Sequence, residues 1–144
     1  MAKLVPLLLA LLAACESGPA PAEFPAAQQI VEQTADHHPD LVRLTIHAVP
    51  SGEARTRVIA SNVPSKLDDW SDPEDLEAIE KQTPVWLEEG ENIDYTHPVV
   101  DRTGTAVAAV GVTIAGNGPE QRQLAERIAA DVSSAILDAP KPLW

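Results

Sequence analysis

The sequence predicts an α+β domain, in which an antiparallel sheet of about five strands is flanked by an N-terminal and a C-terminal helix. Three observations predict this class. Apolar and polar residues alternate with a period of two over residues 41–49, turn sequences separate further apolar segments, and apolar stripes of helical period lie near both ends of the chain. With 144 residues, the chain has room for one domain with a sizeable core and hardly for two.

The N-terminal part of this domain is predicted to be a helix followed by a hairpin. A helix over residues 26–37 follows Pro25, which suits the first turn of a helix, and Pro39 disfavours helical geometry at the residue before it. The alternating residues 41–49 predict a strand. After a Pro-Ser-Gly-Glu turn, a second strand is predicted over residues 55–60.

The middle of the chain is less regular. Asp72 is predicted to cap a short helix that has Pro73 at its first position. A brief strand over residues 85–87 and a longer one over residues 93–100 follow. Pro98 confines its part of the longer strand to an edge or an end of the sheet, because proline has no N–H to donate to a neighbouring strand.

The C-terminal part is predicted to be a hairpin return and a long helix. A turn over residues 101–104, with Asp first and Gly last, leads to a strand over residues 105–115. This strand is apolar on both faces, as a central strand covered on both sides would be. Gly111 within it leaves room for a ligand or for the close approach of a helix. The final helix, of about 19 residues, begins at Pro119 and is stopped by Pro140.

The chain's only cysteine, Cys15, directly follows Leu-Ala-Ala and an apolar run over residues 4–12. This segment resembles the signal peptide and lipobox of bacterial lipoproteins. The run is too short to span a hydrocarbon core, which takes roughly 20 helical residues. The resemblance implies that Cys15 becomes a lipidated N-terminus held permanently on a membrane. The alternative is an ordinary secretory signal with a coincidental cysteine.

The residues after Cys15 are rich in Pro, Ala and Gly and predict a flexible tether. The chain thus divides into a signal peptide (1–14), the lipidated cysteine with its tether (15–25), a folded domain (26–138) and a C-terminal tail (139–144). The expected location is a membrane surface facing the periplasm. The resemblance favours the outer membrane over the inner one, because Glu16 rather than Asp follows the cysteine.

Net charge and cysteine content argue against two classes of binding partner and against stabilisation by disulfides. The formal net charge of -12 argues against binding to nucleic acid and against electrostatic adhesion to anionic lipid. With Cys15 lipidated, the chain has no second cysteine and no disulfide, so packing alone has to hold the fold.

The predicted order of elements resembles that of PAS-like or single Cache sensor domains. The strand 41–49, the sequence His-Pro-Val-Val-Asp-x-x-Gly over residues 97–104 and the small-residue strand 107–114 carry the resemblance. It implies that helices cover one sheet face and that the other face lines a small-molecule pocket. Cache domains usually sit between two transmembrane helices. Here the final helix ends near Pro140, so signalling would need a separate envelope protein partner.

Two groups of side chains are candidates for such a pocket. The polar face of the predicted hairpin gathers three of the six arginines, and guanidinium groups suit carboxylate or phosphate ligands. Large rings in the segments that close the pocket suit an apolar wall. The predicted ligand-binding residues are Arg43, Arg57, Trp70, Trp86, Tyr95 and His97, and the predicted ligand is small and anionic. The alternatives are a solvated arginine face and rings that only fill the core.

No enzyme, metal or cofactor is predicted. The histidines lack an H-x-x-x-H spacing and a Ser/Asp frame, and no Gly-rich phosphate loop follows a strand. The acidic residues between 68 and 75 lack the alternation of a calcium loop, and a solvated, helix-capping face explains them better.

The predicted function is a membrane-anchored lipoprotein with a sensor-like domain that binds a small molecule. The alternative is an envelope protein–protein interaction scaffold without such a ligand. Whether Trp70 and Trp86 surround an internal void or are packed solid discriminates between the two.

Overall fold

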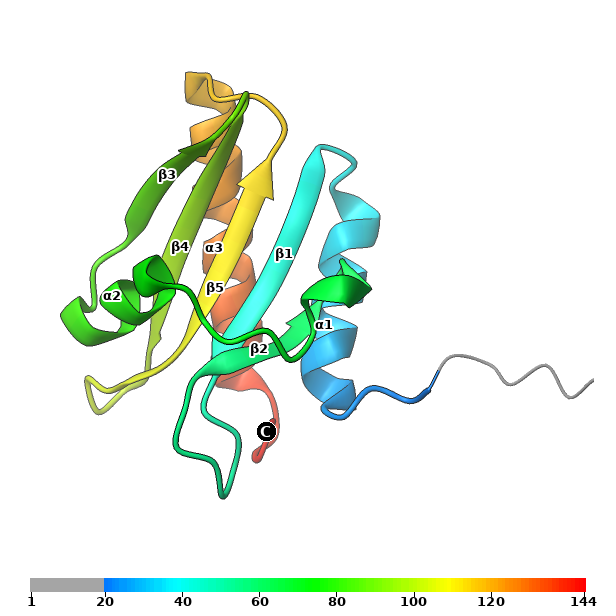
Figure 1. Cartoon of the computed structure of the whole chain (residues 1–144), viewed down its shortest axis with the longest axis vertical. Coiled ribbons are helices and arrows are strands. Elements are labelled where there is room, and N and C mark those ends of the chain that lie inside the picture. The colour runs from blue at the N-terminus through cyan, green and yellow to red at the C-terminus, as the bar shows by residue number, and fades with distance from the viewer. Residues whose placement is uncertain (1–19) are drawn as a thin grey trace, which may run out of the picture.

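A five-stranded antiparallel sheet forms the middle layer of the domain, with the strand order β2-β1-β5-β4-β3 (Figure 1). The computed structural model describes residues 20–144. The predicted signal peptide, Cys15 and residues 16–19 lie outside the described residues. The elements in chain order are α1 (Pro25–His37), β1 (Leu41–Ala48), β2 (Arg57–Ser61), the 3₁₀ turn η1 (Pro64–Lys66), α2 (Pro73–Lys81), β3 (Val85–Glu89), β4 (Asn92–Val100), β5 (Ala106–Ile114) and α3 (Pro119–Asp138).

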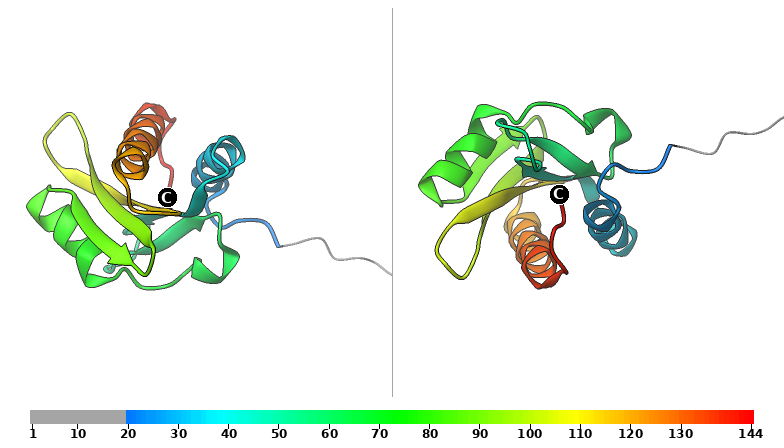
Figure 2. Two further views of the ribbon diagram at one scale, coloured as in Figure 1. Left: turned by 90° about the horizontal axis from the view of Figure 1, so that it is seen from above. Right: turned by 90° about the horizontal axis from the view of Figure 1, so that it is seen from below.

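Helices cover both faces of this sheet, and they cover them differently. Figure 2 shows α1 and α3 side by side on one face and the short α2 on the other. The main hydrophobic core lies under α1 and α3, where Leu44, Ile46, Val112 and Ile128 are fully buried. The α2 face is buried too, but many of its buried side chains are polar. The predicted α+β class with an antiparallel sheet and helices at both ends is therefore confirmed.

The helix starts agree with the local sequence because proline occupies the first position of α1, α2 and α3. Asp72 is the N-cap residue of α2, as predicted, and its backbone N–H donates to Oδ2 of Asp75 at 2.9 Å. The central position of β5 is confirmed as well: it lies between β1 and β4, and both α3 and α2 pack on it.

β4 is an inner strand, yet its proline causes no loss of pairing. β3 pairs with β4 only over Asn92 to Thr96, so Pro98 lies beyond the end of β3 and has a partner on one side only, Ala109 of β5. The prediction that Pro98 sits at an edge or an end of the sheet is confirmed.

β2 is shorter than predicted, and its first residue, Arg57, faces the other side of the sheet from the one predicted. It begins at Arg57, and the pairing with β1 shifts by one residue between Ile46 and His47. Because of this β-bulge, Val58 lies opposite His47 and Arg57 lies opposite Ala48. Arg57 therefore shares the face of Ala48 and not that of His47, which corrects the predicted arrangement of the hairpin arginines.

Residues 68 and 69 of the same chain pair with the outer edge of β2. Val58 donates its N–H to the carbonyl of Asp69 at 2.9 Å, and the N–H of Asp68 donates to the carbonyl of Val58 at 3.0 Å. On the same strand, the side-chain amide of Gln28 in α1 exchanges two hydrogen bonds with the backbone of Ser61, at 3.0 and 3.1 Å.

Both ends of the described chain pack on the domain. Phe24 and Trp144 pack against the core, and Leu143 is buried within it. Among residues 20–144, no helix is both long enough and apolar enough to cross a membrane.

Candidate functional site

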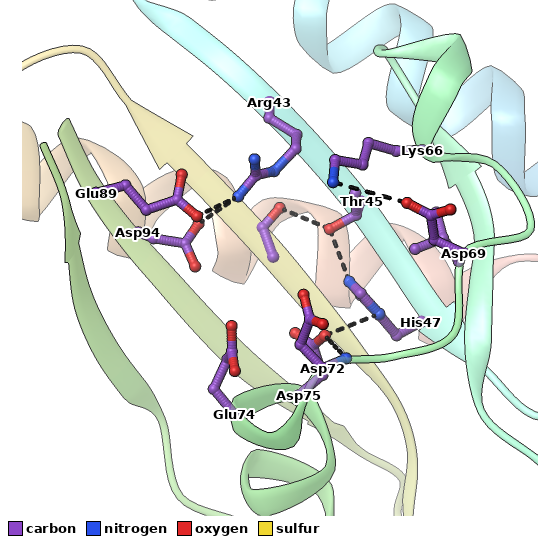
Figure 3. A pocket seen from close by; sticks show the side chains of 12 residues that line it. Arg43, Thr45, His47, Lys66, Asp69, Asp72, Glu74, Asp75, Glu89 and Asp94 are labelled. Atoms are coloured by element: carbon purple, nitrogen blue, oxygen red, sulfur yellow. Dashed lines mark hydrogen bonds and ion pairs between the residues drawn. The ribbon is translucent and has the colours of Figure 1, made fainter.

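A polar cavity of about 80 Å³ lies on the α2 face of the sheet (Figure 3). This is the face opposite α1 and α3, where the resemblance to PAS-like domains implies a pocket. The residues that line the cavity come from β1, β4, β5 and the segment from η1 to α2, with one further residue from each of β2 and β3. They are Arg43, Thr45, His47, Val58, Lys66, Asp69, Asp72, Glu74, Asp75, Glu89, Asp94 and Gly111.

The strands position the floor of the cavity through their two-residue alternation. Thr45 and His47 of β1 point to this face while Leu44 and Ile46 point into the apolar core. Gly111 of β5 lies opposite Thr45, and a Cβ on it would lie 2.5 Å from the Thr45 hydroxyl oxygen. The glycine therefore allows β1 side chains to cover β5 at this point. The space predicted for a ligand or for the close approach of a helix is taken by the side chain of Thr45.

His47 is the centre of the hydrogen-bonded network on this floor. Its Nε2 lies 2.8 Å from the hydroxyl of Thr45, which donates in turn to the carbonyl of Gly111 at 3.5 Å. Its Nδ1 lies 2.9 Å from the hydroxyl of Ser71 and 3.3 Å from Oδ2 of Asp75. This chain fits a neutral ring that donates from Nε2 and accepts at Nδ1.

The titration of this pair is displaced from ordinary values by burial. Burial, and then the charge of Arg43, lower the pKa of His47 to about 4. Burial raises the pKa of Asp75 to about 7, although the backbone N–H of Asp72 opposes this shift. Near neutral pH, the ring of His47 is therefore uncharged, and its 3.3 Å contact with Asp75 is not an ion pair.

Arg43 and Asp94 form a second polar group at the other side of the cavity. Nη2 of Arg43 lies 2.9 Å from Glu89 and 3.6 Å from the buried Asp94, which also accepts from the hydroxyl of Thr113 at 2.6 Å. Burial works against the charge of Arg43, but its hydrogen bond with Glu89 raises its pKa above the ordinary value. Burial also raises the pKa of Asp94.

The charge of the cavity differs from the predicted one. The sequence predicts an arginine-lined wall for an anion, but six carboxyl groups and only two permanently cationic side chains, Arg43 and Lys66, line the cavity. Arg43 is bound to Glu89, and Lys66 lies 3.6 Å from Asp69. Among residues 20–144, no group of three or more His, Asp or Glu side chains gathers closely enough to hold a metal ion.

The structure brings only one of the predicted ligand-binding residues, Arg43, to this cavity. Arg57 is buried on the α1 side of β2, where it bonds to Glu23, Glu53 and Asp68 at 2.5 to 3.1 Å. Its hydrogen bond to Glu53, with the other carboxylates, raises its pKa further.

The three rings of the β3–β4 hairpin lie together on the α3 side of the sheet. Trp86 and Tyr95 are cross-strand partners with ring centres 4.1 Å apart, and Tyr95 Oη lies 3.2 Å from Nδ1 of His97. Arg122 of α3 covers Trp86 at 5.2 Å. Tyr95 belongs to the hydrophobic core and Trp86 packs against it, and none of the three rings lines the cavity under α2.

Trp70 is half-exposed, with the guanidinium of Arg55 stacked on its ring at 4.0 Å. Neither Trp70 nor Trp86 surrounds an internal void. The prediction that the large rings share one pocket with Arg43 is therefore wrong. For Tyr95 the reason is the alternation of β4, which places it with Ile93 and Val99 on the core face.

Sequence reasoning missed the acidic residues of the site. The expectation of a solvated acidic face holds for the exposed Asp68, Asp69 and Asp72, but Asp75 is buried on the sheet-facing side of α2. Asp94 gives a usable signal, since it stands between Ile93 and Tyr95 in a strand that is otherwise buried on both faces. Its position predicts a polar partner on the same face, and the structure supplies Thr113.

Comparisons with known proteins define the fold but no family. No protein-family model matches the chain, and no curated protein matches it in sequence. Among solved structures, the GAF domain of an Acinetobacter phosphoenolpyruvate-protein phosphotransferase is similar with a TM-score of 0.57 and 16% identity, over 78% of this chain and 80% of that one.

Two further solved structures show the range of proteins that share this architecture. The inducer-binding domain of the transcription factor PobR from Acinetobacter, in complex with 3-hydroxybenzoic acid, gives a TM-score of 0.52 at 10% identity over 80% of this chain and 97% of that one. A type II free methionine-R-sulfoxide reductase from Thermoplasma acidophilum gives 0.51 at 12% identity, over 76% and 88%. The chain therefore has the GAF/PAS-like fold.

Proposed function

We propose that the protein is a lipid-anchored, sensor-like binding domain that faces the periplasm and takes a small cationic molecule into the cavity under α2. The observation that carries this proposal is the polar cavity whose lining includes the buried carboxyl groups of Asp75 and Asp94. The fold supports it, because similar structures include an inducer-binding domain in complex with a small molecule.

Charge favours a cation over the anion that the arginines suggest. A carboxylate ligand would meet six carboxyl groups, while an ammonium or guanidinium group would find acceptors at Asp75 and Asp94. Because burial raises the pKa of Asp75 to about 7, this acceptor gains its charge as the pH rises through that value. The affinity for an amine should therefore increase from pH 6 to pH 8.

The size of the cavity limits the ligand to a small molecule. One water needs on the order of 10–15 Å³ of such space, so a cavity of about 80 Å³ holds roughly six non-hydrogen atoms. Short aliphatic amines and guanidines meet both the charge and the size.

Binding is a better proposal than catalysis. His47 is buried and uses both ring nitrogens in hydrogen bonds, so it is poorly placed to take a proton from a substrate. The chain's only cysteine is Cys15, which leaves no thiol between residues 20 and 144 for redox chemistry of the kind a sulfoxide reductase performs.

A thermal-shift titration of residues 20–144, which contain the whole described core, tests the ligand. Short amines and guanidines should raise the Tm with saturation, whereas carboxylic acids of matched size should not. At ten times the Kd the expected gain is about 1.4 kcal/mol, or roughly 5 °C. Asp94→Asn should abolish the shift, and Glu91→Gln, at an exposed turn, should leave it unchanged. A shift with acids and none with amines would contradict the proposal.

The anchor needs its own experiment. The chain expressed with residues 1–14 in a Gram-negative host should incorporate palmitate and fractionate with the outer membrane. Cys15→Ser should release it into the soluble fraction, and Glu16→Asp should move it to the inner membrane. Incorporation of palmitate by the Cys15→Ser variant would contradict lipidation at this residue.

One observation favours the alternative of an envelope interaction scaffold. The cavity is smaller than the roughly 300–1,000 Å³ of most ligand pockets, and the rings predicted to line it are packed elsewhere. A flat thermal-shift panel together with crosslinking to one defined envelope protein would replace the ligand proposal by this one.

A further inference from the structure

The two ends of the domain along the sheet differ in charge. One end, here called the tether end, consists of residues 20–24, the β1–β2 loop (49–56), the β4–β5 turn (101–105) and the C-terminal segment (139–144), which Figure 1 and the right view of Figure 2 show together. The opposite, far end consists of residues 38–40, 90–91 and 115–118.

The tether end is locally balanced in a strongly acidic protein. Its three basic side chains are Arg55, Arg102 and Lys141, and its three acidic side chains are Glu23, Glu53 and Asp101. The far end has Asp40 and Glu91 with no Lys or Arg, and beside it Glu89 pairs with Arg43 at 2.9 Å and Glu88 with Arg122 at 3.7 Å. The tether end can therefore approach a bilayer surface with less net negative charge than the far end.

Two tryptophans at or beside the tether end are each paired with a cation. The half-exposed Trp70, which forms an isolated bridge with Arg57 at the start of β2, carries Arg55 on its ring at 4.0 Å. Lys141 lies 5.9 Å from the ring centre of Trp144. Tryptophan with a neighbouring Lys or Arg suits the interface of a bilayer, because the ring is amphipathic and the cation reaches phosphate.

An apolar groove opens at the same end. It has a volume of about 290 Å³ and is lined by Val107, Leu137, Pro142, Leu143 and Trp144, with Asp101 and Lys141 at its rim. Leu137, near the C-terminal end of α3, is more than one-third exposed and adds apolar surface to this groove.

The short segment between Cys15 and α1 indicates that a membrane is what the tether end contacts. Only nine residues lie between Cys15 and Pro25, and the ten Cα–Cα steps from one to the other span at most about 35 Å. α3 alone, with 20 residues, runs about 30 Å along the domain. If Cys15 is in the bilayer, this segment can bring the tether end to its surface easily, and the far end only by running the full length of the domain.

We propose that the tether end rests on the membrane, with Trp70 and Trp144 in the lipid headgroup region and the apolar groove turned towards it. This inference rests on the proposed lipid anchor at Cys15. The cavity under α2, bounded by the sheet and by α2 itself, then stays accessible from the aqueous side.

Fluorescence quenching on vesicles tests the proposal. The full chain with processed Cys15 is reconstituted into vesicles of phosphatidylethanolamine and phosphatidylglycerol that contain lipid brominated near the headgroup. Three variants keep one tryptophan each: W86F/W144F keeps Trp70, W70F/W86F keeps Trp144, and W70F/W144F keeps Trp86. Trp86, stacked on Tyr95 under the first turns of α3, is the matched control.

Bromolipid should quench Trp70 and Trp144 at least threefold more strongly than Trp86. Equal quenching of all three, or none in a protein that floats with the vesicles, would overturn the proposed orientation and leave the anchor intact. A chain that does not float at all would overturn the anchor, and the orientation with it.

A measurement on the wild-type chain tests the same orientation without relying on tryptophan variants that could fail to fold. Hydrogen exchange on vesicles, compared with detergent, should slow by at least threefold in residues 49–56 and 139–144 and stay unchanged in residues 90–91 and 115–118. The reverse pattern would place the far end on the membrane.

Discussion

Gly111 shows how a single residue shapes the cavity. The position that a Cβ would take lies 2.5 Å from the hydroxyl of Thr45 and 3.5 Å from Nε2 of His47. A methyl group there therefore forces Thr45 to turn and breaks its hydrogen bond to the ring of His47.

Gly111→Ala should destabilise the protein by about 1–3 kcal/mol, since the added methyl overpacks a rigid strand pair. Chemical denaturation measures the change. The double variant T45A/G111A removes the clash, so its loss should be smaller than the sum of the two single losses by at least about 0.5 kcal/mol. Strict additivity would show that Thr45 is not what the methyl meets.

Asp75 and His47 should give the stability a pH dependence in which the two residues oppose each other. The pKa of Asp75 is 3.8 in the unfolded chain and about 7 in the folded one, so its contribution is present in acid and is lost as the pH rises through 7. The pKa of His47 falls from 6.5 to about 4, so its contribution is present above 6.5 and is lost as the pH falls through 4.

Asp75→Asn removes the first of these contributions and leaves the second. The free energy of unfolding of this variant, relative to the wild type, should therefore increase from pH 4 to pH 7 and then level off. Urea denaturation at pH 5, 6, 7 and 8 measures it, with Glu91→Gln as an exposed control. A difference that does not change with pH would show that Asp75 titrates normally in the folded protein.

At the scale of elements, α2 is the weakly held one. Over its nine residues only Asp75 and Ala78 are buried, and Leu76 is exposed, whereas α3 buries six side chains, five of them in the main core. Much of what fixes α2 on the sheet is polar: Asp75 contacts His47 and accepts from Thr96 at 3.4 Å. Such an element should open without global unfolding.

Native-state hydrogen exchange should report this local opening. The amides of α2 should exchange at least tenfold faster than those of α3, which corresponds to about 1.4 kcal/mol. Asp75→Ala should speed exchange in α2 further, while Glu80→Ala, exposed on the same helix, should not. Equal protection of α2 and α3 would show that the two sheet faces are held with similar strength.

The elements were predictable where the sequence carries local signals. The starts of α1, α2 and α3 follow from their prolines, and β1 follows from its alternation, because these signals act within a few residues. The orientation of Arg57 was not predictable, since it depends on a β-bulge that only the pairing of two strands creates.

The candidate site was predictable in its place and not in its composition. Arg43, Thr45 and His47 share the pocket face as their spacing predicts. The burial of Asp75 and Asp94 depends on how α2 docks on the sheet, which is a long-range property. The prediction places Tyr95 in the pocket, but neighbouring residues of a strand face opposite sides. Tyr95 therefore faces the core while Asp94 faces the cavity.

At the scale of the whole molecule, charge is a destabilising property. The net charge of -12 means that carboxylates repel one another over much of the surface, and buried Arg57 neutralises only a local group of them. At 0.1 M salt, the repulsion between exposed groups more than about 10 Å apart is largely screened.

Raising the ionic strength from about 10 to 500 mM should therefore stabilise the protein by about 1 kcal/mol, or roughly 4 °C in Tm. Melting curves in sodium chloride and in choline chloride should agree, because the effect is screening and not sodium binding. The variant E88Q/E91Q, which removes two exposed acids near the far end, should show a smaller increase. A Tm that falls with salt would mean that ion pairs outweigh the repulsion.

The pairing of residues 68 and 69 with β2 has a consequence for how copies of this protein meet. A sheet edge with free N–H and C=O groups is a template onto which another chain can add a strand. In β2 the backbone groups of Val58 are taken by that segment, and those of Ser61 by Gln28. The other edge, β3, ends in Glu88 and Glu89, whose like charges would face each other in an edge-to-edge pair. Neighbouring molecules can thus be densely spaced without their sheets fusing into a continuous aggregate.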